Sequence, residues 1–227
     1  TPTDHLIVDC KKNILCPGLI DMCSHLREPG EEYKENIESA SKAALAGGIT
    51  SMICMPDTNP IIDQISVIEF IARRARETNG VKIFPSASIT KGLKGETLTE
   101  IGLLQEAGAI LFTEGDQALS NTKIMKQALQ YAKTFNALII QHPQDKDLSV
   151  NGVMNSGALA NKLGLPGISK VAEIIQVEKD LRLIENTGGK IHFINITTKE
   201  SIIAINKAKN NGLNVSCSTS PHYFTSN

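Results

Sequence analysis

Two side chains that can bind a metal, and a third that can bind a carboxylate, stand at alternate positions near the start of the sequence. Cys23 and His25 would share one face of an extended segment, and Arg27 follows at the same spacing. A thiolate and an imidazole are common zinc ligands, and a guanidinium can hold a carboxylate through two hydrogen bonds. On its own the Cys-x-His spacing is a weak signal, and a buried thiol beside a hydrogen-bonded histidine also explains it, so both interpretations stay open here.

Polar residues also follow several later apolar stretches of the sequence. These residues are Asp57, Glu114, Asp116, His142 and Asn195. Carboxylate and imidazole groups can ligate a metal or transfer protons. A turn would also explain Asp57, and a solvated loop would explain Glu114 and Asp116. Their repeated occurrence after apolar stretches indicates a polar pocket.

The apolar stretches alternate with helical patterns along nearly the whole chain. The expected helices are 31–46, 63–78, 98–107, 121–134, 169–186 and 199–210, and the expected strands are one around Ile20 and 49–54, 81–87, 109–112, 137–140, 190–194 and 213–217. About seven such repeats favour an α/β fold of the (β/α)8 TIM-barrel type that lacks its last unit. Such barrels carry their functional residues at the carboxyl ends of the strands. Residues 6–16 have the pattern of a β-hairpin outside the barrel.

The composition is that of a globular protein without an electrostatic specialisation. The 227 residues include 23 basic and 24 acidic side chains, for a net charge of -1, so we expect no binding to nucleic acid or to an anionic membrane. No apolar stretch approaches the roughly 18 residues of a membrane span. The five cysteines are odd in number and form no CxxC pair, which suits reduced thiols in the cytoplasm. The start at Thr1 instead of Met indicates a trimmed chain.

Several segments together resemble the class I dihydroorotases of the amidohydrolase superfamily. The segments are PGLID at 17–21, HLREPG at 25–30, MPDTNP at 55–60, FT at 112–113, QH at 141–142, LGLPGI at 163–168, AE at 172–173, TGG at 187–189 and SPH at 220–222. They stand in the same order and with similar gaps as in that family, and they cover essentially the whole chain.

The resemblance implies a metal-dependent (β/α)8 barrel with a small β-sandwich domain built from both ends of the chain. Residues 1–16 would then be a remnant of the sandwich and residues 17–227 the barrel without its last unit, with both ends truncated. The implied reaction is the reversible hydrolysis of dihydroorotate to N-carbamoyl-aspartate in pyrimidine biosynthesis. Zinc would supply the hydroxide, a carboxylate would move protons, and an arginine and an asparagine would hold the substrate carboxylate.

The resemblance also implies roles for individual residues. His25 and His142 match metal-binding histidines, and Arg27 matches the arginine that holds the substrate. Four positions depart from the family pattern: Cys23 replaces a metal-binding histidine, Asp57 the substrate-binding asparagine, Glu114-Gly115-Asp116 an Asp-Asp-Gly with a bridging carboxylate, and Asn195 another metal-binding histidine. Cys23 can still bind zinc, and Glu114 or Asp116 can supply a carboxylate. Asn195 is a poor ligand, however, and Asp57 would repel a substrate carboxylate.

These substitutions favour a dihydroorotase-like protein with impaired or lost catalysis, which binds zinc weakly if at all. In the family, such relatives act as structural partners of aspartate transcarbamoylase. The alternative is an active zinc-dependent dihydroorotase with an unusual Cys/His site. A hydrolase of another cyclic substrate, such as a hydantoin or allantoin, is disfavoured by Arg27, and a metal-free module that binds a carbamoyl-aspartate-like ligand is disfavoured by Asp57. We also expect a homo-oligomer located in the cytoplasm.

Overall fold

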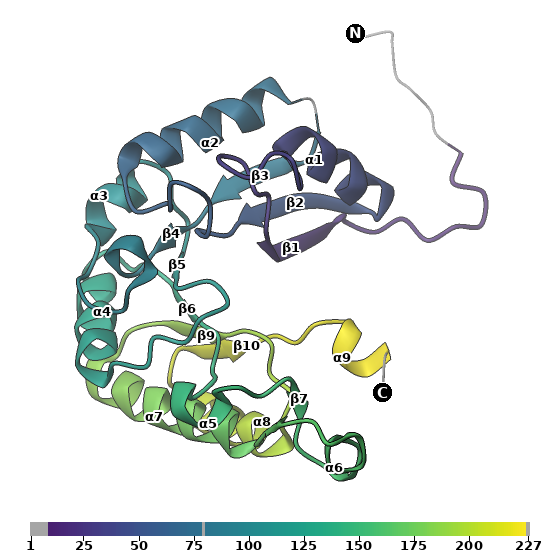
Figure 1. The fold of residues 1–227 in the computed structure, drawn as a ribbon. Coiled ribbons are helices and arrows are strands. Elements are labelled where there is room, and N and C mark those ends of the chain that lie inside the picture. Colours follow the sequence, from purple (N-terminus) through teal and green to yellow (C-terminus); the bar gives the residue numbers. More distant parts are fainter. Residues whose placement is uncertain (1–8, 79, 226–227) are drawn as a thin grey trace, which may run out of the picture.

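The computed structural model describes residues 9–78 and 80–225, and Figure 1 shows an arc of strands with helices along its outer side. The strands are β1 (Leu19–Ser24), β2 (Ile49–Cys54), β3 (Lys82–Pro85), β4 (Ala87–Ser88), β5 (Phe112–Thr113), β6 (Ile139–Gln141), β7 (Met154–Asn155), β8 (Gly167–Ile168), β9 (Ile191–Phe193) and β10 (Val215–Cys217). The helices are α1 (Ile37–Ala46), α2 (Ile65–Glu77), α3 (Ile101–Glu106), α4 (Thr122–Thr134), α5 (Lys146–Ser149), α6 (Ala158–Leu163), α7 (Val171–Thr187), α8 (Lys199–Asn210) and α9 (His222–Thr225), with a 3-10 turn η1 (Lys91–Leu93).

The strands of the arc follow one another in sequence order. β1, β2 and β3 pair in parallel, and β4, β5, β6, β9 and β10 form a second parallel sheet in that order. Residues 82–88 join the two sheets, because Ser86 N donates to Cys54 O and Ala87 N donates to Leu111 O, each over 3.0 Å. This sequential parallel order is the one expected for a (β/α)8 barrel, and it brings the carboxyl ends of the strands to one edge. Within the described residues β10 and β1 do not pair, so a closed barrel is not observed.

Apolar side chains pack on both faces of the curved sheet. The larger cluster lies between strands and helices and includes Ile37, Ile68, Phe112, Leu129 and Ile184. A smaller cluster lies on the opposite face and consists of Ile53, Leu111, Ile140 and Ile194, with Met22, Cys23 and Leu138 packed against it. Cys23, near the end of β1, is therefore a neighbour of this smaller cluster.

A side-chain cap sets where α1 begins. The side chain of Asn36 accepts from Ser39 N and the hydroxyl of Ser39 accepts from Asn36 N, so α1 begins at Ile37. The expectation of a helix from residue 31 is wrong, because residues 32–34 form a turn and the helix begins only at Ile37. At the other end of a helix, Gly188 adopts a left-handed φ of 69° and ends α7.

In the described part of the chain, no helix combines the length and the apolarity needed to cross a membrane.

The expected N-terminal hairpin is wrong for the part of it that the structure describes. Residues 6–8 lie outside the described residues, and residues 9–18 contain no strand. Ile14 and Leu15 are 93% and 85% exposed, so they lack the packing surface that a two-stranded hairpin needs. The assignment of residues 1–16 to a sandwich domain and of 17–227 to the barrel stays a prediction.

A short segment with elements of its own separates β6 from α7, where the sequence pattern indicates neither a helix nor a strand. It contains α5, the parallel pair β7 and β8, and α6, and it lies at the end of the arc near α7 and α8 (Figure 1). Elements of two to six residues are too short to show a periodicity in the sequence, which explains why they were missed.

Candidate functional site

The residues singled out by the sequence lie at the carboxyl ends of the strands, in two groups. The first group, here called the His25 cluster, contains Cys23 near the end of β1, His25 and Arg27 after β1, Asp57 after β2 and Asp116 after β5. The second group, here called the His142 pair, follows β6 and β9 and contains His142 and Asn195.

His25 lies between two carboxylates. Its Nδ1 is 2.8 Å and 3.0 Å from the two carboxylate oxygens of Asp57, and its Nε2 is 3.4 Å from Oδ2 of Asp116. The hydrogen bonds to Asp116 and Asp57 raise the pKa of His25 to about 9, although burial opposes the shift. This shift favours the protonated imidazole at neutral pH, and a ring nitrogen must lose its proton before it can bind a metal or act as a general base.

Asp57 also contacts the guanidinium of Arg27. Nη1 of Arg27 donates to Asp57 Oδ2 over 3.2 Å and to Glu31 Oε2 over 3.3 Å, and Lys34 donates to Glu31 over 2.7 Å. Burial opposes ionisation of Asp57, but the hydrogen bond and charge of His25 and the charge of Arg27 keep the pKa of Asp57 below its ordinary value. Arg27, to which the resemblance assigns the binding of a substrate carboxylate, is already paired with two carboxylates of this chain.

The backbone holds this arrangement by a close approach of two loops. Arg27 has a positive φ of 61°, which a residue with a side chain adopts at a cost. Asn59 N donates to Pro29 O over 2.9 Å, and a Cβ on Gly30 would lie 2.1 Å from the carbonyl oxygen of Asn59. Gly30 is therefore needed for the loop of Arg27 to pack against the loop of Asp57.

Cys23 is held as a thiol. Burial, followed by the charges of Asp21 and Asp116, raises the pKa of Cys23 to about 11. A thiolate at this position would need a nearby positive charge such as a metal ion, since the local carboxylates disfavour it.

The two carboxylates that follow β5 have different environments. Both oxygens of Glu114 accept hydrogen bonds from Thr90, one from the backbone N–H and one from the hydroxyl, each over 2.7 Å. Glu114 is buried and joins the end of β4 to the end of β5, which is a structural contact. Asp116 is 69% exposed and faces His25, so it is the carboxylate of the two that the geometry favours for chemistry.

The His142 pair is separate from the His25 cluster in its hydrogen bonds. His142 Nδ1 is 3.5 Å from Nδ2 of Asn195, and His142 Nε2 is 3.1 Å from Oε1 of Gln144. Asn195 has a left-handed φ of 59°, a conformation that asparagine tolerates better than most residues. These three residues line a polar cavity of about 520 Å³ between the strand ends and the first turns of α7 and α8.

The donor set does not fit the tetrahedral zinc site that the resemblance implies. Such a site needs three or four deprotonated ligands about 2.0–2.3 Å from one ion. Among residues 9–78 and 80–225, no three His, Cys, Asp or Glu side chains converge in this way. Both ring nitrogens of His25 face carboxylates, and His142 faces two amides.

Several residues of this network were not singled out from the sequence. They are Asp21, Glu31, Lys34, Thr90 and Gln144. The signal for Glu31 was its position four residues after Arg27, which allows an ion pair. The contact between Thr90 and Glu114 joins positions 24 residues apart, and nothing local in the sequence indicates it.

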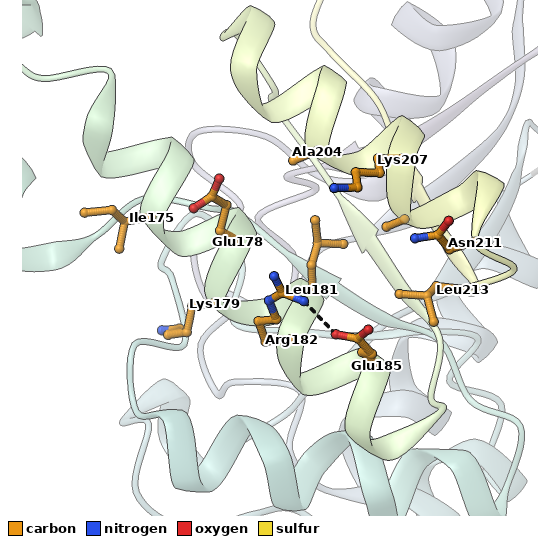
Figure 2. Close-up of a pocket in the computed structure, with 11 residues that line it drawn as sticks. Ile175, Glu178, Lys179, Leu181, Arg182, Glu185, Ala204, Lys207, Asn211 and Leu213 are labelled. Carbon is orange, nitrogen blue, oxygen red and sulfur yellow. Dashed lines mark hydrogen bonds and ion pairs between the residues drawn. The ribbon is translucent and has the colours of Figure 1, made fainter.

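A second hollow lies on the outer surface, away from both groups. Figure 2 shows it between α7 and α8, where Arg182 and Glu185 form an ion pair of 2.9 Å beside Leu181 and Leu213. Its volume is about 440 Å³, and none of the candidate residues lines it. The candidate chemistry therefore belongs to the strand ends and not to this groove.

Comparison with known proteins places the chain in a family. A family described as Dihydro-orotase-like matches residues 12–201. The chain is 44% identical over 224 residues to the dihydroorotase of Syntrophus aciditrophicus and 42% identical over 228 residues to that of Syntrophobacter fumaroxidans. Each alignment covers 99% of this chain, but 53% and 52% of the relatives, so the chain spans about half the length of the curated relatives it matches.

Solved structures show the same fold. The L-hydantoinase (dihydropyrimidinase) from Arthrobacter aurescens has a TM-score of 0.74 at 20% sequence identity, over 91% of this chain and 48% of that one. A D-hydantoinase has a TM-score of 0.70 at 22% identity. At 20% and 22% identity these likenesses concern the fold alone, whereas the family match together with the two dihydroorotases shows that the chain belongs to the dihydroorotase-like family.

Proposed function

We propose that this chain is a dihydroorotase-like protein of pyrimidine biosynthesis whose site is closed by its own ion pairs, and that it acts as a structural partner of aspartate transcarbamoylase. One observation carries the proposal: the carboxylate of Asp57 contacts both the ring of His25 and the guanidinium of Arg27. By family resemblance, these two groups would bind the metal and the substrate. The partner enzyme comes from that resemblance, and the predictions of a homo-oligomer and a cytoplasmic location are kept with it.

The charges explain why metal and substrate would both bind poorly. A metal must displace the proton of His25, and the flanking carboxylates stabilise that proton. A substrate carboxylate must displace Asp57 and Glu31 from Arg27, and Asp57 would remain beside it as a like charge. Asp57 therefore opposes both the binding of a metal at His25 and the binding of a substrate carboxylate at Arg27.

The partnership can be tested by mixing the purified chain with aspartate transcarbamoylase from the same organism and measuring the mass of the species by analytical ultracentrifugation. We expect a complex of defined stoichiometry that forms equally well with the wild type and with Asp57→Asn, since the contact would not use the site. Sedimentation as two independent species would contradict the partnership.

An active zinc-dependent dihydroorotase with a Cys/His site is the second candidate, and one distance favours it. Two ligands of a tetrahedral zinc ion at about 2.0–2.1 Å lie about 3.4 Å apart, and His25 Nε2 is 3.4 Å from Asp116 Oδ2. Asp57 would then orient the ring through Nδ1, as a carboxylate often does for a metal-binding histidine. Cobalt substitution tests this candidate, because bound cobalt with a thiolate ligand gives an absorption band that Cys23→Ser removes.

A further inference from the structure

A fully buried carboxylate lies beneath the loop that carries Asp116. Asp180 stands in the middle of α7, has no exposed surface, and accepts hydrogen bonds from Gln176 over 2.9 Å and from Gln141 over 3.1 Å, both at Oδ2. Its other oxygen, Oδ1, has no partner among the described residues. Burying a carboxylate costs free energy because the group loses its hydration, and an apolar side chain at this position would avoid that cost. A specific role of the Asp180 carboxylate in this part of the fold would explain its presence.

Gln141 links Asp180 to the loop between β5 and α4 by hydrogen bonds. Its Oε1 accepts from Leu119 N over 3.1 Å, and its Nε2 donates to Leu119 O over 3.3 Å as well as to Asp180. Asp180 accepts from the same Nε2 that donates to Leu119 O, so it reinforces the amide orientation that the Leu119 N–H and C=O require. In the reverse orientation the amide would present a donor to Leu119 N–H and an oxygen to the carboxylate, and both contacts would be repulsive.

Two further side chains of α7 hold the same loop. Gln176 lies 3.5 Å from Leu119 O, and Lys179 donates to Ser120 O over 3.0 Å and to Gln176 Oε1 over 2.9 Å. The loop is thus attached to the helix at two consecutive carbonyl groups. Three residues before the attachment, Asp116 reaches His25.

We propose that Asp180 is a positioning residue that, through Gln141 and Gln176, holds the loop at Leu119 and so places Asp116 against His25. Gln141 directly precedes His142, so the same clamp joins the loop of the His25 cluster to the strand that carries the His142 pair. The clamp would place the loop in this way whether or not the site turns over a substrate.

The test compares amide hydrogen exchange, followed by NMR, in four variants of the full chain. Asp180→Leu removes the acceptor, and Asp180→Asn keeps an acceptor oxygen for the two glutamine amides. Lys179→Met removes the contact to Ser120 from a partly exposed position and serves if Asp180→Leu does not fold. Thr187→Val is the matched control, because Thr187 is buried on the same helix and its hydroxyl bonds Leu183 O within that helix.

We expect Asp180→Leu to raise the exchange rate of the Leu119 amide about tenfold or more beyond the change in the core amides of α7. Lys179→Met should give a smaller rise at the same loop, Asp180→Asn should restore nearly wild-type exchange, and Thr187→Val should leave the loop unchanged relative to the core. In a crystal structure of Asp180→Leu, Asp116 should have left His25. Uniform exchange changes that match Thr187→Val, or a crystal structure in which Asp116 keeps its contact with His25, would overturn the inference.

Discussion

Replacing Asp57 with asparagine tests the electrostatic reasoning at the site most sharply. Asparagine keeps the size and an acceptor oxygen for Nδ1 of His25 but removes the negative charge. With a pKa of about 9, His25 is neutral in roughly 1% of molecules at pH 7. Asp116 supplies the largest part of the upward shift in the pKa of His25, and Asp57 supplies the next largest part. Removing the negative charge of Asp57 should therefore lower the pKa of His25 by about 1.

The same change should strengthen metal binding. About 10% of the His25 rings would then be neutral at pH 7, and an ion that binds the neutral ring would gain roughly tenfold in affinity, or about 1.4 kcal/mol. Arg27 would also lose one of its two carboxylate partners. The pKa is measured by an NMR titration of the His25 ring, and zinc affinity by isothermal titration calorimetry.

Asp147→Asn is the matched control, since Asp147 is an exposed carboxylate on α5 outside the His25 cluster. It should change neither quantity. A His25 titration midpoint that is the same in the wild type and in Asp57→Asn would refute the reasoning, as would a wild-type midpoint near the ordinary value of 6.5.

Three further predictions concern stability and reactivity. Burial raises the pKa of Asp180 to about 6, so its contribution to stability is full below about pH 4 and is lost as the pH rises to 6. Urea unfolding should show the wild type losing up to about 3 kcal/mol relative to Asp180→Asn between pH 4 and 7, and parallel pH profiles would count against this. Gly30→Ala should lower the free energy of unfolding by about 2 kcal/mol or more, since its φ is 104° and its Cβ would clash. Gly48→Ala, with a φ of 79° and open space, should cost about 1 kcal/mol, and equal losses would contradict the clash. At pH 8, iodoacetamide should modify exposed Cys16 well before Cys23, as peptide mass spectrometry would show, and the reverse order would disprove the protected thiol.

The repeating part of the fold could be predicted from the sequence because its signals are local. Periodic apolar positions gave helices close to 65–77, 122–134 and 199–210, and the strands fell within a few residues of their observed places. The start of α1 was missed because the decisive signal was the pair Asn36 and Ser39 and not the helical pattern of 31–46. The segment from 146 to 168 consists of elements too short to show a period.

The membership of the site was easier to predict than its contacts. Strand-end positions identified His25, Asp57 and Asp116, and the structure brings these three together. The sequence could indicate that Asp57 would repel a substrate, but not that it would pair with His25, which lies 32 positions away. The buried clamp at Asp180 was hidden for the same reason, because its partners come from three separate segments of the chain.

The most direct test of the proposed closed site is dihydroorotate hydrolysis by the purified chain over a range of zinc concentrations, with bound zinc measured in the same samples. At pH 7 we expect less than one zinc per chain and no turnover above that of zinc and buffer alone. One zinc bound per chain, with turnover that rises in proportion to it and disappears in His25→Gln, would contradict the account.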